Sequence, residues 1–138
     1  MTETADGGSA PRGVSGGPRL LLRLEGLALF LVALAAFAMS AQPWWLFFLL
    51  ILAPDLGMLG YLFGNRAGAA IYNAVHLTIW PLALTLAAVV VADLGIFAVA
   101  MIWLAHIGID RALGYGLKFA HGFGFTHLGR IGRGARQR

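Results

Sequence analysis

The sequence contains no cysteine and few charged residues. Without cysteine, the chain has no disulfide framework, no thiolate nucleophile and no thiolate metal ligand. Charged residues make up 12% of the 138 positions and hydrophobic residues 59%, and the mean hydropathy is +0.79. This composition excludes an ordinary water-soluble domain. Any metal site in this chain has to use His, Asp or Glu.

The charges that are present are mainly basic. The net charge is +4 and the isoelectric point is near 10.4, values that are also found in nucleic-acid-binding proteins. Here, however, the basic residues lie mostly in the two terminal segments. Charge placed this way sets the orientation of membrane proteins, so we predict no nucleic-acid partner.

Hydrophobic residues fall into four runs, each long enough to cross about 30 Å of hydrocarbon as a helix of roughly 20 residues. The runs cover residues 20–39, 44–63, 69–92 and 94–113. Their connections are short, which makes neighbouring helices antiparallel. We therefore predict an all-α, polytopic integral membrane protein, with a four-helix transmembrane bundle over residues 19–118 that is surrounded by the lipid bilayer.

The two terminal segments differ from these runs. Residues 1–18 are rich in Gly, Ser, Thr and Pro and lack an apolar period, which predicts a disordered tail. Residues 119–138 form a basic tail rich in Gly and aromatic residues, which predicts contact with anionic lipid at the head groups. A second interpretation makes this tail a lid that brings His121 or His127 over the membrane domain.

The positions of Lys and Arg predict the orientation. Arg12, Arg19 and Arg23 precede or begin the first run, Arg66 lies in the second connection, and the first and third connections have neither residue. This alternation places both termini in the cytoplasm. A cleaved signal peptide is the alternative for the first run, but the run is long for that and contains Glu25.

Ionisable side chains inside the predicted helices are the main candidates for function, because charge is costly in lipid. They include Asp55, His76, His106 and Asp110. Asp55 and His76 lie about 12–14 Å from the turn that joins their helices, and His106 lies about 10 Å from the end of its helix. His106 and Asp110 are four residues apart and so share one helix face. The sequence therefore predicts a polar layer on the cytoplasmic side.

Two imidazoles and two carboxylates on facing helices suit a divalent zinc, iron or manganese ion. We predict Asp55, His76 and His106 as metal ligands, and Asp110 as a ligand, as a catalytic base or as the group that orients a histidine. With an open coordination position, such a site could support hydrolysis of a lipid-like substrate. The outer candidates are Glu25, Asn73 and His127.

Three other interpretations stay open. The polar layer could only fix helix packing through interhelical hydrogen bonds, worth about 0.6 kcal/mol per pair. His76 and His106 could instead be axial ligands of a haem. A proton relay through the same residues is the third interpretation, although four short helices without repeats make a poor transporter unless they form a homo-oligomer.

Several motifs resemble a bacterial membrane protein family of unknown function, domain-of-unknown-function family 4260. They are RLEG at 23–26, APDLGMLGY at 53–61, YNAVH at 72–76, WLAHIGIDRALGYGLK at 103–118 and THLG at 126–129. The resemblance spans about residues 20–132 and implies a compact four-helix protein of a bacterial inner membrane, without an activity. A looser similarity to bacterial membrane-bound metal-dependent hydrolases lacks their motif order.

Overall fold

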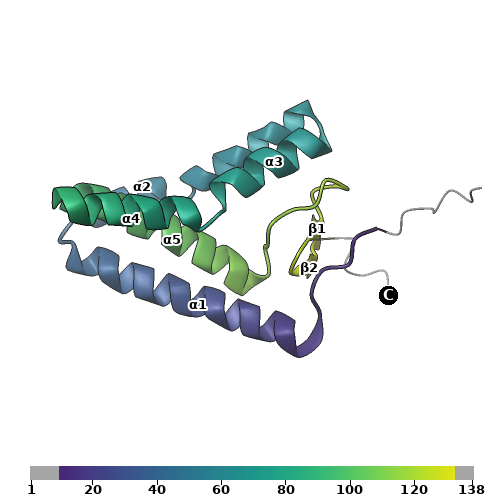
Figure 1. Ribbon diagram of the computed structural model, residues 1–138, viewed down its shortest axis with the longest axis horizontal. Helices are drawn as coiled ribbons and strands as arrows, with labels where there is room; N and C mark the ends of the chain where they lie inside the picture. Colours follow the sequence, from purple (N-terminus) through teal and green to yellow (C-terminus); the bar gives the residue numbers. More distant parts are fainter. Residues whose placement is uncertain (1–9, 133–138) are drawn as a thin grey trace, which may run out of the picture.

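The computed structural model describes residues 10–132, which are mostly helical and end in a short C-terminal hairpin (Figure 1). The elements in chain order are α1 (Gly16–Met39), α2 (Trp44–Leu50), the 3-10 helix η1 (Ala53–Phe63), α3 (Asn65–Val75), α4 (Ile79–Val91), α5 (Leu94–Leu113), β1 (Phe125–Thr126) and β2 (Gly129–Arg130). The strands β1 and β2 pair antiparallel.

Within residues 10–132, four helical segments are long and apolar enough to cross a membrane. They are Gly16–Met39, Trp44–Phe63, Asn65–Val91 and Leu94–Leu113. The all-α class and the four spans predicted from hydropathy are therefore confirmed. The first span begins four residues before the predicted start at residue 20, and the third begins at Asn65 instead of residue 69.

The second and third spans are broken, whereas the sequence predicted one helix over 44–63 and one over 69–92, each only bent at its proline. The second span changes from α2 to η1 just before Pro54, and the third is interrupted between α3 and α4 just before Pro81. Proline has no N–H and clashes with the preceding turn, which explains a break at each place. At the second break, the indole Nε1 of Trp103 donates to the carbonyl oxygen of Val75 at 2.7 Å. Side chains therefore satisfy backbone groups that lipid could not.

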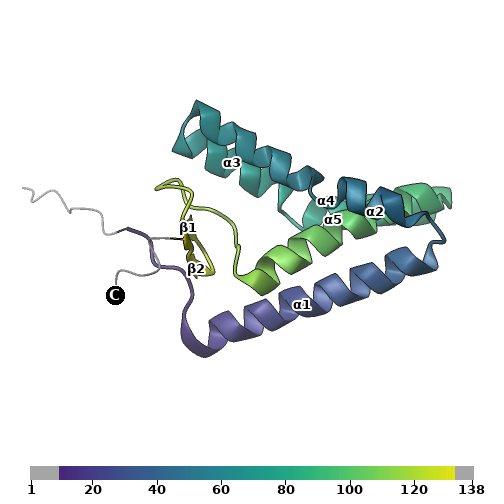
Figure 2. The same ribbon diagram turned by 180° about the vertical axis from the view of Figure 1, so that it is seen from behind.

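The helices form two arms that diverge from a common region (Figures 1 and 2). One arm is the antiparallel pair of α1 and α5, and the other is the pair of η1 and α3. The hairpin of β1 and β2 lies between the two arms. At the other end of the molecule, α2 and α4 pack on α5, which is the most buried helix.

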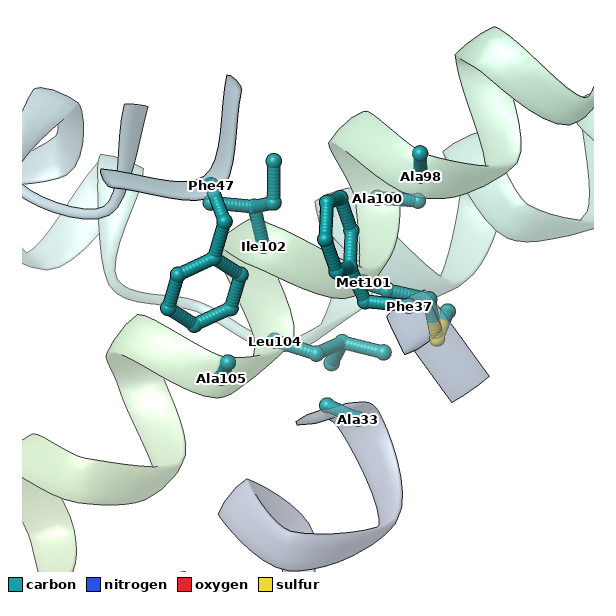
Figure 3. Close-up of a cluster of buried hydrophobic side chains, with 9 residues drawn as sticks. All are labelled: Ala33, Phe37, Phe47, Ala98, Ala100, Met101, Ile102, Leu104 and Ala105. Atoms are coloured by element: carbon teal, nitrogen blue, oxygen red, sulfur yellow. The ribbon is translucent and has the colours of Figure 1, made fainter. Parts of the chain in front are cut away.

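The apolar core lies at the end of the molecule where α1, α2 and α5 meet (Figure 3). Phe37 of α1 is fully buried, and its ring lies 5.1 Å from the ring of Trp44 and 5.2 Å from that of Phe47. Small residues of α5, including Ala98 and Ala105, let the neighbouring helices approach closely. The core therefore fixes α5 as the central helix on which the polar residues are mounted.

Both predicted tails pack against each other in the part that the structure describes. The N–H of Val14 donates to the carbonyl oxygen of His127 at 2.7 Å, and α1 already begins at Gly16. The prediction of a disordered tail over residues 1–18 therefore differs from the structure after residue 9, while residues 1–9 lie outside the described residues. The C-terminal tail contains the hairpin, and its residues 133–138 also lie outside them.

Gly26 of α1 and Gly108 of α5 allow these two helices to touch. A Cβ atom on Gly108 would lie 2.6 Å from the backbone nitrogen of Phe30 and 2.8 Å from the carbonyl oxygen of Gly26. Backbone atoms cannot move aside as a flexible side chain can. The α1–α5 contact therefore requires glycine, as at other close helix crossings in membranes.

Gly108→Ala is expected to lower the free energy of unfolding by about 1–3 kcal/mol, because the added methyl group forces α1 and α5 apart. Gly17→Ala is the matched control, since a Cβ atom there has no neighbour within 4 Å. Thermal unfolding in detergent, followed by circular dichroism, measures both. If Gly108→Ala unfolds at the same temperature as the wild type, the close contact between α1 and α5 does not require glycine.

Candidate metal centre

Three elements bring four ionisable side chains to one point: Asp55, His76, His106 and Asp110, hereafter the His–Asp cluster. One nitrogen or oxygen atom from each lies within 4.8 Å of the others. Asp55 is in the first turn of η1, His76 caps the C-terminus of α3, and α5 carries the other two on one face. Both helix breaks lie beside this cluster. The structure thus brings together the four residues that the sequence singled out.

The distances within the His–Asp cluster are short and similar. The Nε2 atoms of His76 and His106 are 3.1 Å apart. Oδ2 of Asp110 lies 3.4 Å from each of these nitrogens. Oδ1 of Asp55 lies 3.4 Å from Nε2 of His106 and 3.8 Å from Nε2 of His76. Four potential donor atoms therefore surround one small volume.

Tyr72 orients two members of the cluster. Its backbone carbonyl lies 2.8 Å from Nδ1 of His76, so Nδ1 carries the proton and a neutral His76 presents a lone pair on Nε2. The two rings also stack at a centroid distance of 3.7 Å. The Tyr72 hydroxyl donates to Oδ2 of Asp110 at 3.2 Å. One residue therefore positions both an imidazole and a carboxylate.

Exposure differs within the cluster. The side chains of His76 and His106 are 4% and 2% exposed, that of Asp110 is 17% exposed and that of Asp55 is 30% exposed. The cluster is therefore closed on the histidine side and open at the edge that Asp55 forms.

The two carboxylates have limited charge compensation. Within residues 10–132, the basic side chains that approach them within 4.0 Å are those of the two histidines. A second carboxylate in such a place is costly unless protons or a cation balance it. The cluster is therefore suited to bind positive charge.

Asn73 does not join the cluster but fastens the C-terminal segment over it. Its Nδ2 donates to the carbonyl oxygen of Lys118 at 2.8 Å, and its Oδ1 accepts from the N–H of Lys118 at 2.6 Å. The amide thus pairs with the backbone as a neighbouring strand would. The Lys118 side chain is buried, and its Nζ lies 4.8 Å from the centre of the Tyr72 ring.

Burial lowers the pKa of Lys118 to about 8, although the carboxylates of Asp110 and Asp55 partly oppose this shift. Nζ also donates to the carbonyl oxygen of Phe123 at 3.0 Å and lies 3.6 Å from the centre of its ring. Both contacts favour the charged form. Lys118 is therefore a buried cation near neutral pH that loses its proton more readily than an exposed lysine.

The metal-free protein is expected to become more stable between pH 8 and about 10.4, because the unfolded chain binds the Lys118 proton over this interval while the folded chain has lost it. Below pH 8 both states hold the proton, and this contribution is constant. We expect a gain of about 1–2 kcal/mol, less than the full shift implies, since Phe123 stabilises the charge. Denaturant unfolding at pH 7.5 and 10 measures it, and Lys118→Met should show a smaller gain than the wild type.

Glu25 and His127, two of the outer candidates, lie away from the cluster. Together with Arg111 they line a separate cavity beside α1, and Glu25 is exposed. Nδ1 of His127 accepts the N–H of Leu117 at 2.8 Å. His121, the other candidate in the lid interpretation, is exposed. The polar layer therefore draws on η1, α3 and α5, and the expected contribution of the first helix is absent among the described residues.

Sequence reasoning missed the roles of Tyr72 and Lys118. Tyr72 and His76 are four residues apart and therefore share a helix face, but this spacing does not show that the phenol reaches α5. Lys118 gave no signal, because its burial depends on the pairing of Asn73 with the C-terminal segment.

Comparison with known proteins places the chain in a family. The family described as "Domain of unknown function (DUF4260)" matches residues 19–131. No curated protein and no solved structure matches the chain. The matched segment includes every member of the His–Asp cluster and the C-terminal hairpin. The chain therefore belongs to the DUF4260 family, which it resembled in its sequence motifs.

Proposed function

We propose that this protein binds one divalent metal ion in the His–Asp cluster. The spacing of its donor atoms carries the proposal. A tetrahedral zinc ion about 2.0–2.1 Å from each ligand separates neighbouring ligands by about 3.3 Å. Five of the six separations between the cluster atoms run from 3.1 to 3.8 Å, and all six are within 4.8 Å. Zinc suits this donor set best, and iron and manganese use the same ligand types.

The orientation of the histidines supports this assignment. The carbonyl of Tyr72 holds the proton of His76 on Nδ1, so that Nε2 is available as a ligand. Metal-binding histidines are usually fixed in this way by a backbone or carboxylate acceptor. A divalent ion would also balance the two carboxylates. It would thereby remove the cost of placing them between membrane-crossing helices.

The same distances argue against haem. Two axial nitrogens on opposite sides of a haem iron lie roughly 4 Å apart with the porphyrin between them. The two Nε2 atoms here are 3.1 Å apart and share their space with carboxylates. A cluster that only fixes packing is the remaining rival, since a hydrogen bond between the imidazoles would join α3 to α5.

Elemental analysis of the detergent-purified full chain tests the proposal. We expect close to one equivalent of zinc, iron or manganese per chain, or uptake of one equivalent of added metal. The double variant His76→Ala, His106→Ala should lose it. If the purified wild type contains no metal and takes up no added zinc, iron or manganese, the cluster only fixes the packing of the helices. An absorption band near 400 nm that the variant lacks would favour haem.

Tyr72→Phe is expected to raise the zinc dissociation constant about tenfold, because Asp110 loses the hydrogen bond that orients it. The variant keeps the ring stacked on His76 and the backbone acceptor. Tyr61→Phe is the matched control, since the described residues offer the buried Tyr61 hydroxyl no hydrogen-bond partner. Competition with a chromophoric zinc chelator measures both affinities. Equal affinities of Tyr72→Phe and wild type would show that the phenol does not orient the ligand.

We further propose hydrolysis of a lipid-like substrate, which the open edge at Asp55 favours. In such sites a bound divalent ion would lower the pKa of a water molecule, which makes hydroxide available for hydrolysis. Oδ2 of Asp110 is a proposed ligand that Tyr72 holds, and we assign the other carboxylate oxygen of Asp110 as the base. Release of fatty acid or phosphate from added phospholipid by zinc-loaded protein, and its loss in Asp110→Asn at a zinc concentration that saturates the variant, tests this activity. Inactivity of the loaded protein on ester and phosphoester lipids would contradict it.

The finer location is also a proposal: a bacterial inner membrane, with both termini in the cytoplasm. Figure 1 places the start of α1, the turn between η1 and α3, and the C-terminal hairpin toward one end of the molecule. This end contains Arg19, Arg66 and Arg130, as the positive-inside rule requires. The chain has no native cysteine, so single cysteines introduced at residues 42 and 66 report the two sides without background. Labelling of residue 66 from outside intact cells would show that the orientation is opposite to the one proposed.

A further inference from the structure

A cavity of about 160 Å³ lies between α1, the end of α5 and the C-terminal hairpin. Its polar lining consists of Glu25, Arg111 and His127, and its apolar lining includes Leu22, Leu29 and Leu128. It does not use the His–Asp cluster, whose four members are absent from its described lining. Sites for drug-sized ligands measure about 300–1,000 Å³, so this cavity has room for a head group but not for a whole lipid.

Two of the lining residues offer donors to an anion. Arg111 presents a guanidinium, which matches phosphate in geometry and charge. The N–H of Leu117 donates to Nδ1 of His127, so a neutral His127 ring carries its proton on Nε2. Burial and the charge of Arg111 lower the pKa of His127, which keeps the ring neutral near pH 7. The cavity thus combines one permanent cation with one neutral donor.

Glu25 gives the cavity a negative rim. The residue is exposed, and within residues 10–132 its carboxylate forms no ion pair with Lys or Arg at 4.0 Å or less. The nearest basic residue in sequence, Arg23, donates its Nε to the carbonyl oxygen of Ala112 at 2.8 Å. Arg111, which lines the same cavity, is a cation close enough to act on Glu25 electrostatically. Once an anion has bound Arg111, the Glu25 carboxylate is available to a cationic group that enters with the anion.

The cavity also lies at the level of the lipid head groups. It is at the end of the molecule where α1 begins and α5 ends, and Gly114 terminates α5 in a left-handed conformation just beyond Arg111. Arginines near the ends of membrane-crossing helices lie at the interface with water. A head group that has a phosphate and an amine joined by a short linker matches this lining, because the phosphate can meet Arg111 while the amine meets Glu25.

We propose that this cavity binds the head group of a phospholipid whose phosphodiester carries a primary amine. Arg111 and His127 bind the phosphate, Glu25 binds the ammonium group, and Leu29, one turn further along α1 than Glu25, contacts the start of the acyl chains. The inference is independent of the proposed metal, because it uses none of the metal ligands.

Native mass spectrometry of the full chain in detergent tests the site. The probes are dihexanoylphosphatidylethanolamine, dihexanoylphosphatidylglycerol and inorganic phosphate. We expect the wild type to bind one amine-bearing lipid at least tenfold more tightly than the glycerol lipid. Glu25→Gln should bind both lipids equally, and Arg111→Gln should bind both at least tenfold more weakly. Arg66→Gln removes an equally charged, exposed residue at the η1–α3 turn and should behave as the wild type.

Three results would overturn the proposal. Equal binding of the two lipids by the wild type would remove the role of Glu25. Unchanged binding by Arg111→Gln would place the phosphate elsewhere. Inorganic phosphate that displaces the lipid at equal concentration would identify free phosphate as the ligand. Glu25→Gln changes an exposed side chain, so the comparison stays decisive even if Arg111→Gln fails to fold.

Discussion

Chelation of zinc is expected to lower the melting temperature of the metal-loaded protein by about 10 °C. The ion would hold η1, α3 and α5 together. Among the described residues, few other contacts join the η1–α3 arm to α5, and one of them is the hydrogen bond from Trp103 to Val75. Without the ion, the two imidazoles are the described basic groups that balance the charge of the two carboxylates. A ligand at about 100 times its dissociation constant stabilises the folded state by about 2.7 kcal/mol.

Thermal scans by circular dichroism, with and without chelator and after zinc is restored, measure this effect. The double variant His76→Ala, His106→Ala provides the control, because its melting temperature should not respond to chelator or to zinc. Restoration by zinc separates loss of the ion from other effects of the chelator. A zinc-loaded wild type whose melting temperature is unaffected by chelator would mean that the ion does not connect the two arms.

The four spans were predictable because hydropathy is a local property of the chain. A run of about 20 apolar residues has few alternatives to a membrane-crossing helix. The breaks within the second and third spans were harder to predict. Proline is common in membrane helices and often causes only a bend. The break before Pro81 also depends on Trp103, which comes from another helix and caps the carbonyl of Val75.

The His–Asp cluster was predictable for a similar reason. Antiparallel helices with short connections place residues at equal distances from a turn at the same level, as with Asp55 and His76. The pair on α5 follows from its four-residue spacing. A place inside a predicted helix does not give the direction of the side chain, however. Glu25 lies in α1 but is exposed beside another cavity.

The C-terminal segment could not be predicted because its structure depends on distant partners. Its many glycines and the lack of an apolar period give no local preference. The segment is held instead by Asn73, by the N–H of Val14 and by the bridge between Lys118 and Thr126. The contacts with Asn73 and Val14 connect residues that are far apart in the chain, and no short window of the sequence contains both partners.

Asp110→Asn and Asp55→Asn are expected to have unequal effects on metal binding. We expect the first to weaken zinc binding by roughly 100-fold, or about 2.7 kcal/mol, and the second by roughly tenfold. Oδ2 of Asp110 lies 3.4 Å from both imidazole nitrogens and is held by the Tyr72 hydroxyl. Oδ1 of Asp55 lies 3.4 and 3.8 Å from them, and its side chain is more exposed. Water can therefore replace Asp55 more readily than Asp110.

Competition titration gives the two affinities, and the visible spectrum of the cobalt-substituted protein gives the coordination number. Asn is nearly isosteric with Asp, so both variants test the charge and not the packing. Equal losses would indicate four equivalent ligands and a closed site that serves stability. A small loss in Asp55→Asn, with the intense absorption of four-coordinate cobalt retained, would identify the Asp55 edge as the coordination position that water or substrate reaches. That result would move the protein from a metal-stabilised bundle towards a hydrolase, because an exchangeable position is what hydrolysis requires.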